Sequence, residues 1–260
     1  MMRNYRIGQI VPSSNTTMES EVSAMLRARE ALAPERFSFH SSRMRMKQVN
    51  TEELARMDSD SDRCALELSD AHVDVLGYAC LVAIMSMGKG YHRVSEERLL
   101  RRTRENGAEA PVITSAGSLI NGLNLIKAKK VAIITPYMKP LTKVVVDYIE
   151  NEGIEVVDAI ALEIPDNIEV GRRDPNAPAE LAKKLNLANV DAIVASACVQ
   201  MPSLTSISTI ERELNLPTVT AASCTTYFML RSLGLKEFAP DAGALLNGDY
   251  ISNTSHQSVK

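Results

Sequence analysis

The sequence predicts an α/β protein made of two similar, tandem, pseudo-symmetric halves, each built on a parallel sheet, with the active site in the cleft between them. One observation is that predicted strands alternate with predicted helices along the chain, as they do in parallel sheets. A second is a pattern that occurs twice, an apolar run led by an aspartate and ending on Ala-Cys, at residues 74–80 and 191–198. A strand buried on both faces is continuously apolar in this way. We therefore expect two equivalent core strands that end at Cys80 and Cys198.

The first half is predicted to span residues 1–127. Its strands are expected where apolar residues alternate or run together, at residues 5–11, 37–46, 74–80 and 111–114. Its helices are expected at residues 19–30, 51–72, 95–107 and 118–127. In the first helix, apolar residues and one arginine recur at helical spacing (Val22, Met25, Leu26 and Arg29), and residues 16–19 before it resemble a capping box.

The second half, residues 128–260, repeats this plan. A strand from Lys130 runs into a loop marked by Pro136, and the later strands are expected at residues 155–164, 191–198 and 217–220. Helices are expected at residues 139–153, 178–187 and 227–233. Four of these features recur in the same order, which predicts an internal duplication of about 120 residues. The polar tail, residues 251–260, is expected to be frayed. A return of residues 221–260 to the first half stays open as an alternative.

Composition excludes several classes of protein. With 260 residues, the chain can form one large domain or two. Its net charge of −3, with acidic and basic residues interspersed, argues against nucleic acid and membrane partners. No apolar run is long enough to span a bilayer, and the start lacks a secretory signal, so we expect a cytoplasmic protein with reduced thiols. No Gly-x-Gly-x-x-Gly, Walker or Cys-x-x-Cys pattern occurs, so neither a nucleotide nor a metal site is predicted.

The cysteines separate into two groups. Cys64, inside a predicted helix, and Cys224, in a polar run near a strand end, are interpreted as packing residues, because buried free cysteine usually behaves as a small hydrophobe. Cys80 and Cys198 are interpreted as functional, because the duplication places both at strand ends, where sites collect in open α/β sheets. The residues that follow them, Leu81-Val82 and Val199-Gln200, can supply backbone N–H donors to an anion.

Polar side chains follow several other predicted strands. Asn15, Asn50, Tyr137 and Asn167 all fall on loops after strands. Each asparagine alone could be a turn former, but the set shares one rim with the cysteines. A second group, Lys89, His92 and Arg93, is better explained as a solvated helix entrance than as an anion site. No histidine is adjacent to a cysteine, so a Cys–His hydrolase has no local support.

These motifs together resemble a known family. Two α/β halves with facing cysteines are similar to the aspartate/glutamate racemase superfamily. Within it, residues 10–19, 77–80, 135–137 and 197–202 resemble the maleate cis-trans isomerases. Amino-acid racemases usually have Asn-Thr after the first cysteine and often Thr-His after the second, where this chain has Leu81-Val82 and Val199-Gln200. Arylmalonate decarboxylases keep only the second cysteine.

The resemblance implies cofactor-free conversion of a small dicarboxylate, maleate to fumarate, usually within nicotinate breakdown. It implies that Cys80 is the nucleophile and Cys198 its acid/base partner. It also implies that the substrate carboxylates are held by side chains and backbone of a defined set: Asn15, Leu81, Val82, Tyr137, Asn167, Val199 and Gln200. We expect a homodimer. Two alternatives stay open, an aspartate/glutamate-type racemase that uses the cysteines as two bases, and a two-lobed binding protein without chemistry.

Overall fold

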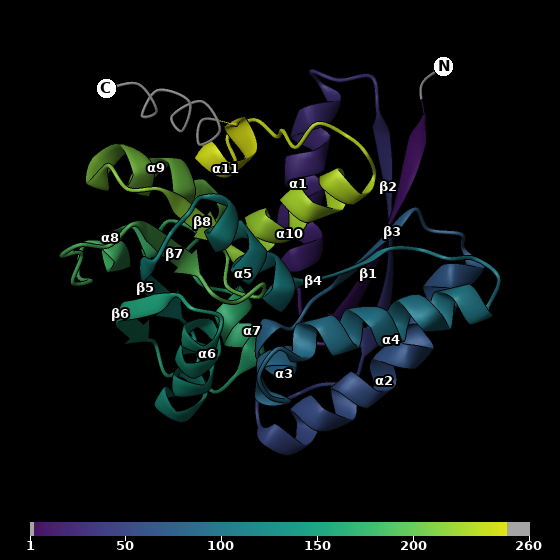
Figure 1. Cartoon of the computed structure of the whole chain (residues 1–260), viewed down its shortest axis with the longest axis horizontal. Coiled ribbons are helices and arrows are strands. Elements are labelled where there is room, and N and C mark those ends of the chain that lie inside the picture. The colour runs from purple at the N-terminus through teal and green to yellow at the C-terminus, as the bar shows by residue number, and fades with distance from the viewer. Residues whose placement is uncertain (1–2, 249–260) are drawn as a thin grey trace.

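Two parallel sheets form the framework of the computed structural model, which describes residues 3–248 (Figure 1). The first sheet has the order β2-β1-β3-β4 and the second the order β6-β5-β7-β8, with every pairing parallel. The strands are β1 Asn4–Pro12, β2 Arg36–Met44, β3 Val75–Tyr78, β4 Val112–Thr114, β5 Lys130–Thr135, β6 Glu155–Ala161, β7 Ala192–Ser196 and β8 Thr218–Thr220. The predicted α/β class and the duplicated plan are therefore confirmed.

Helices alternate with these strands. They are α1 Met18–Glu30, α2 Thr51–Asp70, α3 Leu81–Ser86, α4 Tyr91–Glu105, α5 Ser115–Leu125, α6 Lys139–Asn151, α7 Asn167–Gly171, α8 Ala177–Ala182, α9 Leu204–Leu214, α10 Ala221–Ser232 and α11 Ala244–Asn247. The sequence did not predict α3, α7, α9 and α11. Three of them are 4 to 6 residues long, too short to show a helical period. The predicted frayed tail, residues 251–260, lies outside the described residues.

The strand order places the cysteines at equivalent points. In each sheet the chain moves from a central strand (β1 or β5) to one edge and then to the other side of that strand, so the order reverses there. A crevice opens at such a reversal, beyond the carboxyl ends of the two strands. Cys80 follows β3 and Cys198 follows β7, the strands on the far side of each reversal.

The aspartates that lead the two cysteine strands also have equivalent roles. The Asp74 carboxylate accepts the backbone N–H of Arg6 at 2.7 Å, and the Asp191 carboxylate accepts that of Lys130 at 2.8 Å. Each carboxylate thus fixes the entry of the central strand beside it. The repeated Asp-to-Cys pattern is therefore a structural unit, with an anchor at one end and a thiol at the other.

Helix α10 of the second half packs against β3 and β4 of the first sheet and lies beside α1 and α5 (Figure 1). Its Met229 approaches Gly77 of β3 so closely that a Cβ at Gly77 would lie 3.1 Å from the Met229 sulfur and 3.2 Å from the Met18 methyl. Arg29 of α1 donates to the carbonyls of Lys236 and Phe238 at 2.7 and 2.9 Å.

No helix within residues 3–248 is long and apolar enough to cross a membrane.

Candidate active site

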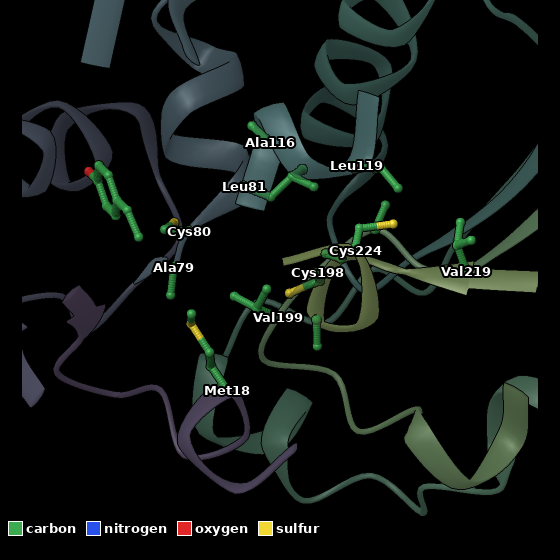
Figure 2. Close-up of a cluster of buried hydrophobic side chains, with 14 of the residues drawn as sticks. Met18, Ala79, Cys80, Leu81, Ala116, Leu119, Cys198, Val199, Val219 and Cys224 are labelled. Atoms are coloured by element: carbon green, nitrogen blue, oxygen red, sulfur yellow. The ribbon is translucent and has the colours of Figure 1, made fainter. Parts of the chain in front are cut away.

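One pocket lies at the carboxyl ends of both cysteine strands. It is lined by the two cysteines and the seven binding residues that the family resemblance implied, and by three further residues: Asn15, Cys80, Leu81, Val82, Tyr137, Asn167, Cys198, Val199 and Gln200, with Pro12, Met46 and Val49. Figure 2 shows the two cysteines on separate strand ends, Cys80 beside Leu81 and Cys198 beside Val199. The volume is only about 20 Å³, room for roughly one water molecule. The pocket is therefore nearly closed in this structure.

Cys80 holds an unusual backbone conformation. Its φ of 103° and ψ of 74° lie in the left-handed region, although it carries a Cβ. The chain leaves β3 there and turns at once into α3, with Cys80 as the N-cap residue. The thiol thereby lies at the helix start, where the nearby Ala83 N–H acts to lower its pKa. Strain of this kind persists where the surrounding structure enforces it, and it is common at functional positions.

Cys198 ends β7 in a different way. It is not among the residues with positive φ, and a turn rather than a helix follows it. The Gln200 N–H lies 3.4 Å from the Cys198 sulfur. The two halves therefore deliver their cysteines to one pocket in unequal settings.

Burial determines the protonation of both thiols. It raises the pKa of Cys80 to about 12, against the lowering effect of the Ala83 N–H, with the charges of Cys198 and Asp58 acting in the same direction as burial. Burial also raises the pKa of Cys198, against the lowering effects of the Tyr137 hydroxyl and the N–H groups of Gln200 and Met201. Both cysteines are therefore predominantly neutral thiols at pH 7 in the closed pocket.

Asn15 and Tyr137 present donors from loops, whereas Asn167, which was expected on a loop, is the first residue of α7. The Asn15 side-chain oxygen caps α1 by accepting the N–H groups of Thr17 and Met18 at 3.1 and 3.0 Å, so its NH₂ group is the end left for a ligand. The Tyr137 hydroxyl donates to the Ala197 carbonyl at 3.3 Å, a long bond that a ligand can replace. The Asn167 NH₂ donates one hydrogen to Ser14 Oγ at 2.8 Å and retains a second.

The Gln200 side chain is already fully engaged. Its Oε1 accepts the Thr16 N–H at 2.8 Å, and its Nε2 donates to the carbonyls of Ser14 and Asn167 at 3.1 and 2.8 Å. It ties the loop after β7 to the loop after β1. The backbone N–H of Gln200 is directed at the Cys198 sulfur instead.

The structure corrects the interpretations of Asn50 and of residues 16–19, and it gives His92 a structural role. Asn50 does not line the pocket, because its side chain caps α2 by accepting the Glu53 N–H at 2.9 Å. The capping box predicted at residues 16–19 is wrong, since Thr17 makes no side-chain cap bond and Asn15 caps the helix instead. His92 is buried and lies 2.6 Å from the Tyr148 hydroxyl, so it joins α4 to α6.

The remaining two cysteines are packing residues, as predicted. Cys224 is fully buried where α10 crosses α5, and a Cβ at Gly122 would lie 2.6 Å from its sulfur. Cys64 is fully buried in α2, and burial raises the pKa of its thiol. Neither lines the pocket.

Met46 and Val49 are the pocket residues that the sequence did not reveal. They lie on the loop between β2 and α2, which reaches the second half through a β-bridge between Gln48 and Asp166. A single apolar residue in the polar stretch Gln48–Asn50 was the available signal, but it does not say what the loop covers.

Within residues 3–248, no group of three or more His, Cys, Asp or Glu side chains is arranged to hold a metal ion.

The fold and the paired thiols define the class, a two-cysteine enzyme with its site between duplicated α/β halves. A family model described as arylmalonate decarboxylase matches residues 7–246. A maleate isomerase from Pseudomonas putida is 62% identical over 96% of this chain and 100% of its own length, and one from Geobacillus stearothermophilus is 59% identical over 96% and 100%. The chain belongs to the arylmalonate decarboxylase family and, within it, to the maleate isomerases.

Solved structures agree with this assignment. The maleate isomerase of Pseudomonas putida S16, crystallised as a variant with maleate, superimposes with a TM-score of 0.93 at 61% identity, over 94% of this chain and 98% of that one. The maleate cis-trans isomerase of Nocardia farcinica, in a cysteine-to-serine variant with a covalently bound succinylcysteine intermediate, gives a TM-score of 0.91 at 45% identity, over 95% and 99%. Arylmalonate decarboxylase itself, at 19% identity and a TM-score of 0.74, shares the fold.

Proposed function

We propose that the protein converts maleate into fumarate without a cofactor, through a covalent adduct on Cys80. The observation that carries the proposal is the meeting of Cys80 and Cys198 in one pocket with uncharged donors around them. Rotation about a C=C bond is prohibitive until the bond becomes single. Addition of a thiolate to the alkene makes it single and divides one hard step into two easier ones.

The first step forms a carbon–sulfur bond. The Cys80 thiolate adds to one alkene carbon, and the π electron pair moves through the neighbouring carbon onto its carboxylate. The Cys198 thiol then gives its proton to that neighbouring carbon, which leaves a succinyl adduct on Cys80 and a thiolate on Cys198. Hydrogen-bond donors directed at the carboxylate stabilise the charge that develops there.

The second step reverses the first after rotation. The adduct turns about its new single bond, and the Cys198 thiolate removes the proton that it gave. The electron pair of that C–H bond reforms the double bond as the carbon–sulfur bond breaks. Fumarate leaves, and both cysteines regain their starting states with no net oxidation or reduction.

The division of roles follows the resemblance, in which the cysteine of the first half is the nucleophile and the cysteine of the second half is its acid/base partner. Both thiols have donors that lower their pKa, the Ala83 N–H for Cys80 and the Tyr137 hydroxyl with the N–H groups of Gln200 and Met201 for Cys198. Cys80 differs from Cys198 in its left-handed backbone at the start of α3.

The donors around the pocket are proposed to hold the two carboxylates. The NH₂ groups of Asn15 and Asn167 and the Tyr137 hydroxyl point to this role, together with backbone N–H groups of the two post-cysteine turns at Leu81, Val82, Val199 and Gln200. None of these donors is a full positive charge. A neutral grip leaves the adduct free to rotate, because no strong ion pair has to break.

Intact-protein mass spectrometry with maleate tests the proposal. Cys80→Ala is expected to abolish turnover and to form no adduct. Cys198→Ala is expected to abolish turnover and still form the adduct slowly, with a mass increase of one maleic acid on Cys80. An adduct on Cys198 with Cys80 unmodified would reverse the two roles. Loss of maleate absorbance is the activity assay, and inert maleate with loss of optical activity from aspartate or glutamate would indicate a racemase instead.

We also propose how the chain is organised and where it acts. The boundary between the halves is placed at residues 127–128. Of the segment 221–260 that was expected to cross back to the first half, α10 is assigned to it, which its contacts with β3 and β4 support, and residues 249–260 lie outside the described residues. A cytoplasmic homodimer is proposed, supported by the four free cysteines and by the half-buried strand β6 at the edge of its sheet, which is available to a second copy. Light scattering on the purified protein tests the dimer.

A place in nicotinate breakdown is part of the same proposal, and growth of a deletion strain on nicotinate tests it.

A further inference from the structure

Glu21 is a buried carboxylate that the mechanism above does not use as a reactant. It lies on α1 of the first half and is 7% exposed. Its Oε1 accepts the backbone N–H groups of Ser203 and Leu204 at 2.6 and 2.8 Å. These groups belong to the first turn of α9 in the second half, and Ser203, the N-cap residue, makes no side-chain cap bond. Glu21 therefore caps α9 from the other half of the molecule.

This contact fixes the loop that carries Cys198. The segment from Cys198 to Ser203 is short, and both of its ends are held to the first half. Near its start, the Gln200 side chain bonds to Ser14 and Thr16. At its end, Glu21 holds the start of α9. The position of the Cys198 loop against the first half is thus set by α1 and by the loop before it, which includes the pocket residue Asn15.

The carboxylate also has an electrostatic effect on one cysteine. Its charge acts to raise the pKa of Cys198, and it is not among the groups that act on the pKa of Cys80. Asp58, which acts on Cys80, is neutralised by a salt bridge to Arg98 at 3.0 Å. Within residues 3–248, the Glu21 carboxylate makes no salt bridge, so its charge is not compensated by a cation.

Two titratable groups line the pocket with Cys198, Tyr137 from the loop after β5 and Cys80 from the end of β3. Glu21 of α1 acts on Cys198 by its charge and does not line the pocket. Arg173 lines the groove in front of Glu21 and forms no ion pair with it. Burial raises the pKa of Glu21, and its two backbone hydrogen bonds lower it. A negative charge at a helix N-terminus is in its favoured location, which supports the ionised form.

We propose that Glu21 is a positioning residue that holds the Cys198 loop against the first half. The consequence for turnover rests on the proposed function. The geometric part, a carboxylate on α1 holding the Cys198 loop, does not depend on the reaction.

Two substitutions separate the two effects. Glu21→Gln keeps an oxygen that accepts both N–H groups and removes the charge. Glu21→Asp keeps the charge but shortens the side chain by one methylene, which breaks the contact with Ser203 and Leu204. Glu96→Gln is the matched control, because Glu96 is also a mostly buried carboxylate that accepts a backbone N–H (Thr114, 3.0 Å) and acts on neither cysteine.

The primary measurement needs no substrate. In a Cys80→Ala background, the rate of Cys198 alkylation by iodoacetamide is followed against pH, with the modified peptide identified by mass spectrometry. Glu21→Gln is expected to move the profile to lower pH by at least about half a unit, the scale of losing a nearby charge. Glu21→Asp is expected to leave the profile's midpoint within about 0.2 units, and Glu96→Gln is expected to leave it unchanged. An unmoved profile in Glu21→Gln would overturn the electrostatic part.

Kinetics of the otherwise unmodified enzyme test the positioning part. Glu21→Asp is expected to lower kcat by at least about tenfold with an unshifted pH profile, because small displacements of a catalytic group are costly. Glu21→Gln is expected to retain kcat at its own pH optimum. The alkaline limb of its pH–activity profile is expected to lie at lower pH than that of the parent enzyme. Full activity in Glu21→Asp would overturn positioning. If the parent enzyme did not isomerise maleate, the proposed function would fail, while the alkylation result would still decide the role of Glu21.

Discussion

The strained backbone of Cys80 predicts an unusual order of stability between two variants that both lack the thiol. At φ 103° and ψ 74°, a residue with a Cβ is strained, by about 1–3 kcal/mol in general. Glycine adopts this region freely but costs about 0.5–1 kcal/mol of extra chain entropy. Comparing Cys80→Gly with Cys80→Ala removes the thiol from both variants and leaves the Cβ as the only difference. We expect the glycine variant to be the more stable by about 0.5–2 kcal/mol, the difference of these two effects.

The same pair of substitutions at Cys198 is the internal control. Cys198 is buried to a similar extent, 6% exposed against 7% for Cys80, but it does not have a positive φ. There glycine is expected to be less stable than alanine by about 0.5–1 kcal/mol. Urea unfolding followed by circular dichroism gives the free energy of unfolding of all four variants. If glycine and alanine differ with the same sign at both positions, the structure stores no strain at Cys80 and the reasoning is wrong.

Three further predictions concern the donors, the thiols and the support behind them. Tyr137→Phe deletes one donor and keeps the ring, and it should lower kcat/KM by about 1–3 kcal/mol of transition-state stabilisation; unchanged kcat/KM would remove Tyr137 from the site. Because burial raises the pKa of Cys80 to about 12, the thiolate fraction grows with pH, so kcat/KM should rise from pH 6 to pH 9, and a flat profile would contradict the thiolate mechanism. Arg98→Met leaves the buried Asp58 charge unpaired, and urea unfolding should show that the free energy of unfolding falls by about 3 kcal/mol. Arg101→Met, at an exposed pair, should change it by less than about 0.5 kcal/mol.

The duplicated plan could be predicted because it depends on local patterns. A continuous apolar run shows a strand buried on both faces, and its recurrence after an aspartate shows that the strand is repeated. Since parallel strands present their carboxyl ends at one edge, the residues after each strand were expected to meet, and Asn15, Cys80, Tyr137 and Cys198 do line one pocket. Short elements such as α3 and α7 were missed because fewer than two helical turns leave no period to detect.

Contacts between distant segments could not be predicted in the same way. Nothing in the polar stretch around Val49 indicates that it closes the pocket, because that depends on the bridge from Gln48 to Asp166. The side chains of Gln200 and Glu21 looked like ordinary polar residues, and their partners lie 184 and 182 positions away in the sequence. Such contacts form only when the two halves come together.

The sequence by itself determined the fold class, the two sheets and the pair of thiols that face each other, because periodicity and strand-end position are properties of neighbouring residues. The tertiary structure decided how the two thiols differ. The left-handed backbone at Cys80 follows from the abrupt passage of β3 into α3. The anchor of the Cys198 loop follows from the meeting of the two halves, where Glu21 of α1 accepts the N–H groups at the start of α9. Pseudo-symmetric sequences supply two similar cysteines, and only their unequal surroundings can give them different chemical roles.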